Sequence, residues 1–205
     1  MNDVNHWDEI YSTRSASQVG WYAPHLVISM QWITELELPA KEPIIDVGGG
    51  ASTLVDDLLG SGHENLTVLD LSAKAISLTR GRLGPSSAAV SWLQGDVTRI
   101  KLPSQYFRLW HDRAVFHFLT EPEQQQSYRD ALLKALTAGG YFIIGTFAPN
   151  APPRCSGLPV QRYTSELLAK TFGKEFGLMR HHKTIHHTPS GVEQEYVYCL
   201  FQRNG

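Results

Sequence analysis

Three aspartates and a glycine run stand at spacings that favour recognition of a small charged ligand. Asp46 precedes Asp70 by 24 residues, and Asp96 follows after 26 more. Two residues after Asp46 the chain begins a run of three glycines, Gly48, Gly49 and Gly50. Glycines between a strand and a helix let a ligand approach bare backbone N–H groups at the helix N-terminus. A carboxylate about 20 residues past such glycines suits a pair of ribose hydroxyls.

The same stretch argues against a dinucleotide. Thr53 occupies the position of the third glycine in the dinucleotide pattern G-x-G-x-x-G. A carboxylate at Asp46 is unfavourable beside a pyrophosphate but favourable beside a positive group. The residues therefore favour a cationic nucleoside.

The elements that must position these residues alternate between strands and helices. We expect strands at 43–47, 66–71, 89–94, 106–111 and 141–146, separated by helical segments. This alternation predicts a parallel sheet covered by helices on both faces. Two later strand-like runs, 176–188 and 195–202, predict an antiparallel hairpin at the C-terminal end. The predicted fold class is α/β, with three α/β/α layers and a seven-stranded, mostly parallel sheet.

Helix boundaries are predicted from capping residues. Trp7, Ile10 and Tyr11 have helical spacing, and a longer helix is expected over 22–38. Serines at 52 and 72 and a threonine at 120 are expected N-caps of the helices that follow them. The residues at 138–140, Ala-Gly-Gly, are expected to end the helix that begins near 120.

Composition narrows the classes of function. The 205 residues are 42% hydrophobic and 19% charged, with a formal net charge of −2, which argues against a broad basic face for nucleic acid. There is no signal segment and no apolar run of the roughly 20 residues that a membrane span needs. Two cysteines, Cys155 and Cys199, are too few for a disulfide framework. We expect a cytoplasmic protein with no membrane partner.

Taken in order, the motifs resemble class I S-adenosylmethionine-dependent methyltransferases, which have a Rossmann-like fold. The resemblance covers about residues 40–148, including the runs at 44–50, 68–72, 95–97, 107–119 and 136–141. It implies one domain over 1–205, with an N-terminal helical lid or cap (1–40) and a cofactor-binding core (41–148). An acceptor-side loop, helix and hairpin complete it (149–205). The implied cofactor is S-adenosyl-L-methionine, and the implied product is S-adenosyl-L-homocysteine.

The resemblance also implies roles for individual residues. Gly48 and Gly50 should line the methionine moiety beside Gly49, with Asp46 toward the ammonium group. At the adenosine, Asp70 should hold the ribose hydroxyls, with Leu71 packing on the adenine and Ser72 also at the cofactor. Asp96 should accept from the adenine amino group, with Val97 beside it.

Transfer from a sulfonium requires alignment of the donor and the nucleophile, and a base only when the acceptor arrives protonated. The candidate bases are His111, Asp112 and His117, and His111 is also expected to lie under the methionine part. Tyr11 and Tyr22 are expected to close over the cofactor from the N-terminal segment. Trp7 and Trp21 are either part of this lid or ordinary packing residues.

The acceptor is a small-molecule nucleophile in our first interpretation. The proline-containing loop over 148–162, with Cys155, is the expected acceptor wall. The run at 107–119 lacks the Asn/Asp-Pro-Pro-aromatic motif, which argues against a nucleic-acid base. The run from Trp7 to Tyr11 is similar to the opening of some protein-lysine methyltransferases, so a protein side chain is the alternative. A binding protein without turnover is a third possibility, and monomer and homodimer both stay open.

Four histidines crowd the run at 181–187, where metal binding and an exposed strand edge are the two interpretations. In a regular strand His182 and His186 share one face and His181 and His187 the other, so four ligands cannot converge. We therefore expect no metal.

Overall fold

The computed structural model describes residues 4–205, so the first three residues of the expected N-terminal lid lie outside the described residues. The α-helices are α1 Val4–Thr13, α2 Val27–Glu35, α3 Leu54–Gly60, α4 Ala73–Leu83, α5 Pro122–Ala135 and α6 Ser165–Phe172. Short 3₁₀ turns are η1 Ala16–Gln18, η2 Gly84–Ala89, η3 Phe116–Phe118 and η4 Gly173–Glu175. The strands are β1 Ile44–Val47, β2 Leu66–Asp70, β3 Val90–Gln94, β4 Phe107–Arg113, β5 Leu136–Phe147, β6 Arg154–Cys155, β7 Leu158–Pro159, β8 Phe176–His187 and β9 Glu193–Arg203.

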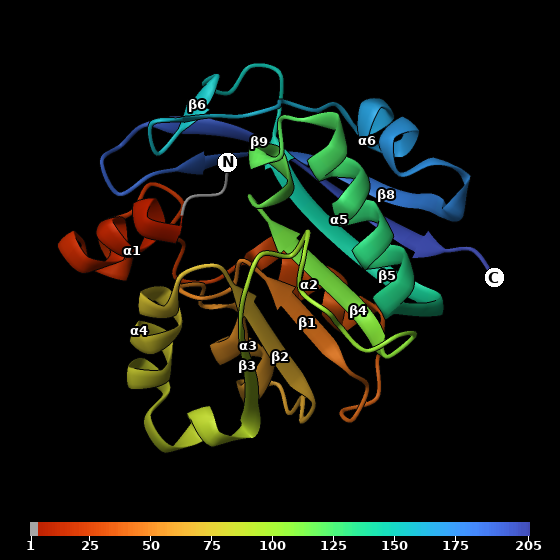
Figure 1. The fold of residues 1–205 in the computed structure, drawn as a ribbon, viewed down its shortest axis with the longest axis horizontal. Coiled ribbons are helices and arrows are strands. Elements are labelled where there is room, and N and C mark those ends of the chain that lie inside the picture. Colours follow the sequence, from red (N-terminus) through yellow and green to blue (C-terminus); the bar gives the residue numbers. More distant parts are fainter. Residues whose placement is uncertain (1–3) are drawn as a thin grey trace.

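Within this described part, a 7-stranded sheet has the order β3-β2-β1-β4-β5-β9-β8 (Figure 1). The strands from β1 to β5 run parallel, whereas β9 is antiparallel to both β5 and β8. This confirms the predicted α/β class with its C-terminal hairpin. The chain changes direction across the sheet between β1 and β4, which is where open α/β sheets bind ligands.

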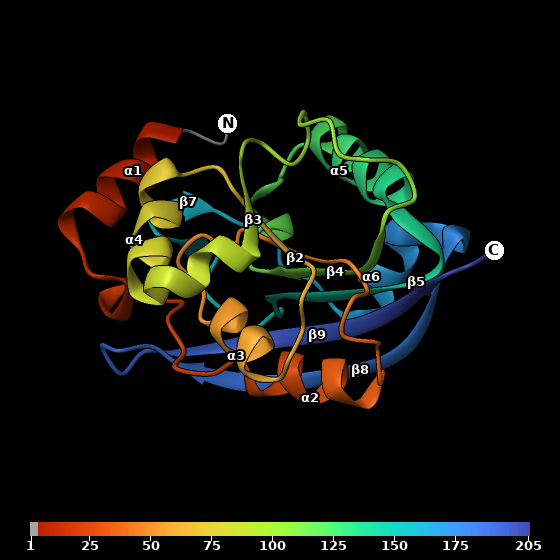
Figure 2. The same cartoon turned by 90° about the horizontal axis from the view of Figure 1, so that it is seen from below.

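Helices cover the sheet on both faces (Figure 2). On one face α2 and α3 contribute Trp32 and Leu54 to an apolar cluster, and on the other face α5 and α6 contribute Leu132 and Phe172. Successive β4 side chains join opposite clusters, because strand side chains alternate between faces. No helix within the described range is long and apolar enough to cross a bilayer.

The helix expected over 22–38 is shorter, and its predicted start is wrong. α2 begins at Val27, because the preceding residues are held in an irregular segment in which the Thr53 hydroxyl donates to the Ala23 carbonyl at 2.9 Å. The segment leaves Trp21 and Tyr22 free to line a pocket. Tertiary contacts at the pocket thus prevail over the helical pattern of the residues before Val27.

Other boundaries shift by smaller amounts. Ser72 caps α4 as predicted, since its hydroxyl accepts from the backbone of Ala75. The N-cap of α3 is Thr53 and that of α5 is Glu121, each one residue later than expected. The predicted helix stop at 138–140 is also wrong, because β5 begins at Leu136, directly after α5. The chain instead bends within β5, at Gly139, whose φ is +69°.

Candidate functional site

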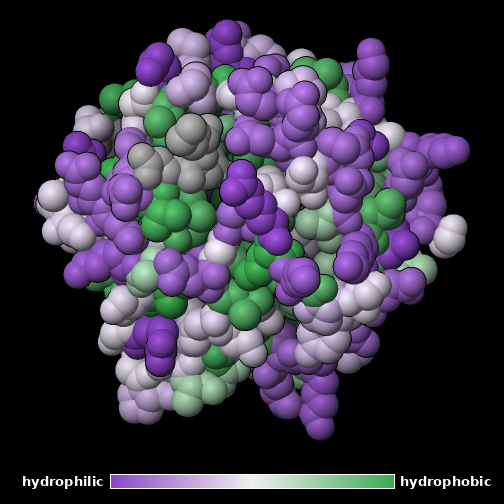
Figure 3. Space-filling view, viewed as in Figure 1, coloured by the Kyte–Doolittle hydropathy of each residue, from purple (hydrophilic) through white to green (hydrophobic). Residues whose placement is uncertain are grey.

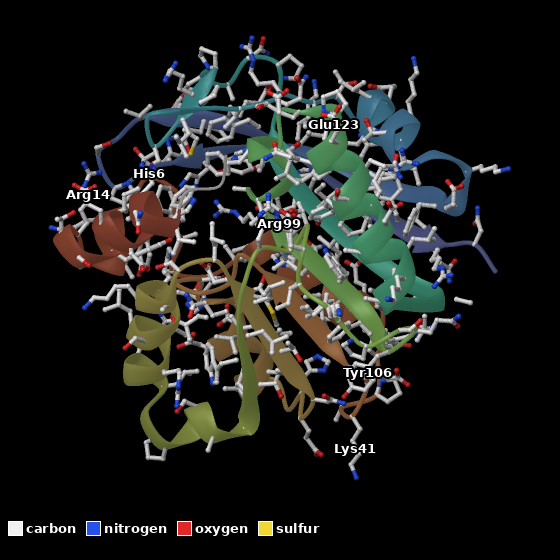
Figure 4. All side chains as sticks on the ribbon, viewed as in Figure 1. His6, Arg14, Lys41, Arg99, Tyr106 and Glu123 are labelled. Carbon is white, nitrogen blue, oxygen red and sulfur yellow. The ribbon has the colours of Figure 1, made fainter. Side chains whose placement is uncertain are left out.

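Two adjoining pockets open at the carboxyl ends of β1, β2 and β4. The larger comprises about 740 Å³ of empty space and the smaller about 430 Å³, with the open solvent at their mouths included. Their linings share five residues, so they form one continuous site: Tyr11, Trp21, Val47, Gly48 and Arg113. In Figure 4, Lys41 and Tyr106 mark the opposite, amino-terminal end of the sheet, while His6 on α1 and Arg99 after β3 lie toward the pocket end. Hydrophobic side chains reach the surface beside α1 in Figure 3.

The glycine turn has its shape because side chains would not fit there. Gly48 has φ +71°, and a Cβ on it would lie 2.1 Å from a methyl carbon of Val115. A Cβ on Gly49 would lie 2.2 Å from Oδ2 of Asp46, and one on Gly50 would lie 2.7 Å from the carboxylate of Asp70. Gly48 lines both pockets, whereas Gly49 and Gly50 make room for the two acids.

Asp46 is held by a buried hydrogen-bonded chain. Its Oδ1 accepts from His111 Nδ1 at 2.7 Å, and His111 Nε2 lies 2.9 Å from the Ser29 hydroxyl. A carboxylate can only accept, so His111 carries a proton on Nδ1. Oδ2 of Asp46 is buried and has no hydrogen-bond partner within residues 4–205. Asp46 thus has one fixed oxygen without a partner, beside Gly49, and the residue lines the smaller pocket.

Asp70 connects the glycine turn to α4. Its Oδ2 accepts from the Gly50 backbone at 2.9 Å, and its Oδ1 accepts from the Ser72 backbone at 2.8 Å. Burial raises the pKa of Asp70 to about 6, although both of these hydrogen bonds favour the carboxylate. Asp70 lines the larger pocket beside Leu71, whereas Ser72 supports it from behind.

The third acid stands at the far side of the larger pocket. Oδ1 of Asp96 accepts from the backbone and the hydroxyl of Thr98, at 2.8 and 2.6 Å. Asp96 and Val97 both line this pocket. The three aspartates predicted to act together thus surround one continuous site.

The three expected bases are not brought together. His111 and Asp112 point to opposite faces of β4, and neither Asp112 nor His117 lines the two pockets. Asp112 accepts from the Tyr128 hydroxyl at 2.6 Å and from the Val115 backbone at 2.9 Å, and burial raises its pKa to about 6. Burial, assisted by the charge of Arg113, lowers the pKa of His117 to about 3, so its imidazole is neutral.

The N-terminal helix closes one side of the larger pocket. Trp7 packs edge-on against Trp21 and Phe118, with ring centroids 5.6 and 5.1 Å apart. The Tyr11 hydroxyl accepts from Trp21 Nε1 at 3.0 Å, and the Ser72 hydroxyl ties α1 to α4 through Asp8. Tyr11 lines both pockets, and Tyr22 lines the smaller one.

Sequence reasoning missed Arg113, which lines both pockets at the end of β4. The available signal was strand parity, because Arg113 is two residues from His111 and so lies on the same face. Cys155, at the end of β6, lines the larger pocket, and burial raises its pKa to about 12, so its thiol is protonated. The histidines at 181–187 lie on the edge strand β8, and within residues 4–205 no group of three His, Cys, Asp or Glu could hold a metal.

Comparisons with known proteins agree with this geometry. Residues 44–140 match a family described as "Methyltransferase domain". The mouse protein named "eEF1A lysine and N-terminal methyltransferase" is 22% identical over 149 residues, which are 70% of this chain but 21% of that protein. The chain thus spans about a fifth of the length of this curated relative.

Two solved structures share the fold over 98% of the chain. One, titled "Conversion of a Disulfide Bond into a Thioacetal Group during Echinomycin Biosynthesis", has a TM-score of 0.78 at 17% identity and is 91% covered. The other is a Burkholderia thailandensis 1,6-didemethyltoxoflavin-N1-methyltransferase with bound 1,6-didemethyltoxoflavin and S-adenosylhomocysteine; it has a TM-score of 0.71 at 18% identity, and 88% of it is covered. The matched family model, the sheet order and the glycine turn with its strand-end acids agree that residues 44–140 form a methyltransferase domain, and the solved structures show the Rossmann-like fold that the sequence predicted.

Proposed function

We propose that this protein transfers the methyl group of S-adenosylmethionine to a small-molecule nucleophile and releases S-adenosylhomocysteine. One observation carries the proposal. The free Oδ2 of Asp46 is buried beside the glycine turn, at one end of a continuous site that also contains Asp70 and Asp96. An unpaired buried carboxylate oxygen is costly unless a ligand supplies its partner, and an ammonium group does so.

The chain's own residues fit the cofactor from end to end. Asp46 accepts from its ammonium group, Asp70 accepts from the ribose hydroxyls, and Asp96 accepts from the adenine amino group. The side chains of Leu71 and Val97, which line the same pocket, cover the apolar faces of the adenine. When bound, the cofactor supplies a methyl group already activated by a positive sulfur.

We assign His111 as a positioning residue in place of a catalytic base. Both of its ring nitrogens are engaged, and it is fully buried. Its contribution is to fix the carboxylate of Asp46 with one oxygen free. For Asp112 and His117 we propose structural roles, since both are fully buried outside the pocket lining. The acceptor then has to arrive deprotonated or as a neutral nucleophile.

A small acceptor is supported by the walls of the larger pocket. Trp7 and Tyr11 from α1, Phe118 from η3 and Cys155 from β6 line this pocket together with the residues proposed for the adenosine. We propose that the N-terminal segment acts as a lid, as expected from the sequence.

The competing proposal is a protein acceptor. It is supported by the name of the mouse relative, an eEF1A lysine and N-terminal methyltransferase. A lysine acceptor needs an open channel for its extended side chain, so the two proposals differ in whether a protein can serve as the methyl acceptor. We expect S-adenosylhomocysteine release with a panel of small thiols, amines and phenols, and none with proteins of a cell lysate.

The donor is tested by thermal unfolding with S-adenosylhomocysteine and, separately, with NAD. We expect the first to raise the unfolding temperature and the second to leave it unchanged. No shift at millimolar S-adenosylhomocysteine would refute the proposal. Binding without product release for any acceptor would favour a binding protein without turnover. The change Tyr11→Phe should reduce turnover if α1 is a lid, and unchanged affinity and turnover would remove Tyr11 from the site.

We further propose a cytoplasmic location. Cys155 and Cys199 are both buried and unpaired, which suits a reducing compartment. Equal recovery of active protein with and without reductant during prolonged air oxidation would count against this reasoning.

A further inference from the structure

Arg113 places a positive charge in the wall shared by the two pockets. Its Nε donates to the Tyr198 hydroxyl at 2.9 Å, and its Nη1 donates to the Trp21 carbonyl at 2.7 Å. Within residues 4–205 it has no ion pair with a carboxylate, unlike Arg82, which pairs with Asp56 at 2.6 Å. A partly buried guanidinium held only by neutral groups retains unused donors and an uncompensated charge.

The groups around Arg113 on the β9 side include polar atoms that lack hydrogen-bond partners. Its guanidinium carbon lies 4.9 Å from the centre of the Tyr196 ring. The Tyr196 hydroxyl is buried without a hydrogen-bond partner in the described part of the chain, and so is Nε2 of His117. Cys155 is close enough for the charge of Arg113 to act on the pKa of its thiol. Of these groups, Tyr196 belongs to β9 and Cys155 to β6, whereas the glycine turn follows β1.

A bound sulfonium cofactor adds a second positive charge to the site that already contains Arg113. A second cation, such as a lysine ammonium, would meet both the positive sulfur and Arg113. An anionic acceptor would instead compensate Arg113 and be drawn toward the positive donor. Arginine binds a carboxylate with two parallel hydrogen bonds, and such pairs are among the strongest in proteins.

We propose that the methyl acceptor is an anionic small molecule whose carboxylate or comparable oxyanion is bound by Arg113. The inference rests on the proposed methyltransferase function and narrows its substrate class. The methionine part of the cofactor also carries a carboxylate, so the test must distinguish the two sources of the anion. The contacts of Arg113 with Tyr196 and Tyr198 on β9, a strand that carries none of the three aspartates, favour the acceptor.

The test uses protein saturated with S-adenosylhomocysteine, in which the cofactor's own carboxylate is already in place. Titration calorimetry then compares benzoate with benzamide, which has a similar shape and no charge. The variants are Arg113→Gln, Arg113→Lys and, as a matched control, Arg108→Gln. Arg108 lies on the same strand and stacks on the Tyr141 ring at 5.1 Å, but it is not part of either pocket wall.

We expect the saturated protein to bind benzoate about tenfold more tightly than benzamide, as a single charge-assisted contact implies. Arg113→Gln should abolish this preference, Arg113→Lys should keep part of it, and Arg108→Gln should keep it all. Equal affinity of the unmodified protein for the two compounds, including no binding of either, overturns the proposal.

A second result also overturns it. If Arg113→Gln weakens S-adenosylhomocysteine about tenfold and leaves the benzoate preference unchanged, Arg113 binds the cofactor's carboxylate. If Arg113→Gln does not fold, the comparison of benzoate with benzamide on the unmodified protein and on Arg113→Lys decides the matter. Failure of the proposed function itself is seen separately, because S-adenosylhomocysteine would then not saturate any of the proteins.

Discussion

Replacement of Asp46 by asparagine removes the charge expected to hold the ammonium group and keeps the side-chain shape. His111 Nδ1 carries a proton, so the carbonyl oxygen of the new amide turns toward His111 and keeps the 2.7 Å hydrogen bond. The NH₂ group then takes the place of the unpaired Oδ2, and the ammonium group of a bound cofactor would meet a donor there in place of an acceptor. The variant should fold normally and bind the cofactor poorly.

The magnitude follows from the contact that is lost. A hydrogen bond to a charged group contributes about 1.5–3 kcal/mol, which corresponds to about a tenfold to hundredfold change in Kd. Calorimetric titration should therefore give an S-adenosylhomocysteine Kd for Asp46→Asn that is higher by this factor. The compound 5′-methylthioadenosine lacks the amino-acid part, and its Kd should be the same for both proteins.

The comparison of the two ligands makes the assay specific for Asp46. Asp130 on α5 is exposed and accepts from Gln126 far from the pockets, so Asp130→Asn controls for a general loss of charge. Equal weakening of both ligands by Asp46→Asn would show that the change acts through distortion of the glycine turn. No weakening of S-adenosylhomocysteine would refute the assignment of Asp46 to the ammonium group.

Three further predictions concern the framework of the site. Gly50→Ala puts a Cβ 2.7 Å from the Asp70 carboxylate and should lower the free energy of unfolding by about 1–3 kcal/mol in urea titrations. Gly60→Ala, with nothing within 4 Å, should raise it by about 0.5–1 kcal/mol, and equal effects would contradict the steric argument. The pKa of Asp70 is raised to about 6 by burial, and ribose hydroxyls favour its ionised form. Affinity for S-adenosylhomocysteine should therefore fall about tenfold per unit as the pH drops below 6, and Asp70→Asn should flatten this profile. Tyr128→Phe leaves a buried indole N–H and the Asp112 carboxylate without the hydroxyl between them, and should cost roughly 2–4 kcal/mol in urea titrations. Tyr106→Phe, at an exposed position, should lower the free energy of unfolding by less than about 0.5 kcal/mol. A similar loss for Tyr128→Phe and Tyr106→Phe would contradict the importance of the Tyr128 hydrogen bonds.

The order of the elements was predictable because it is written in local patterns. Apolar runs, capping serines and glycine stops predicted five parallel strands and the closing hairpin, and Ser72 caps α4 as expected. Boundaries failed where tertiary contacts override propensity. The segment before α2 stays irregular because it walls a pocket, and β5 starts directly after α5 because Leu136 pairs with Phe107 on β4.

The sequence by itself determined the donor side of this protein. Parallel strands bring their carboxyl ends to one edge, so the spacing of Asp46, Asp70 and Asp96 was sufficient to place them at one site. Tertiary structure alone decided which polar residues face that site. His111 became a support for Asp46 because its second nitrogen meets Ser29, 82 residues away, and Arg113 became a pocket residue because β9 and the segment before α2 meet around it. Such long-range convergence leaves no periodic trace in the chain, because each partner satisfies its own local pattern equally well in other surroundings.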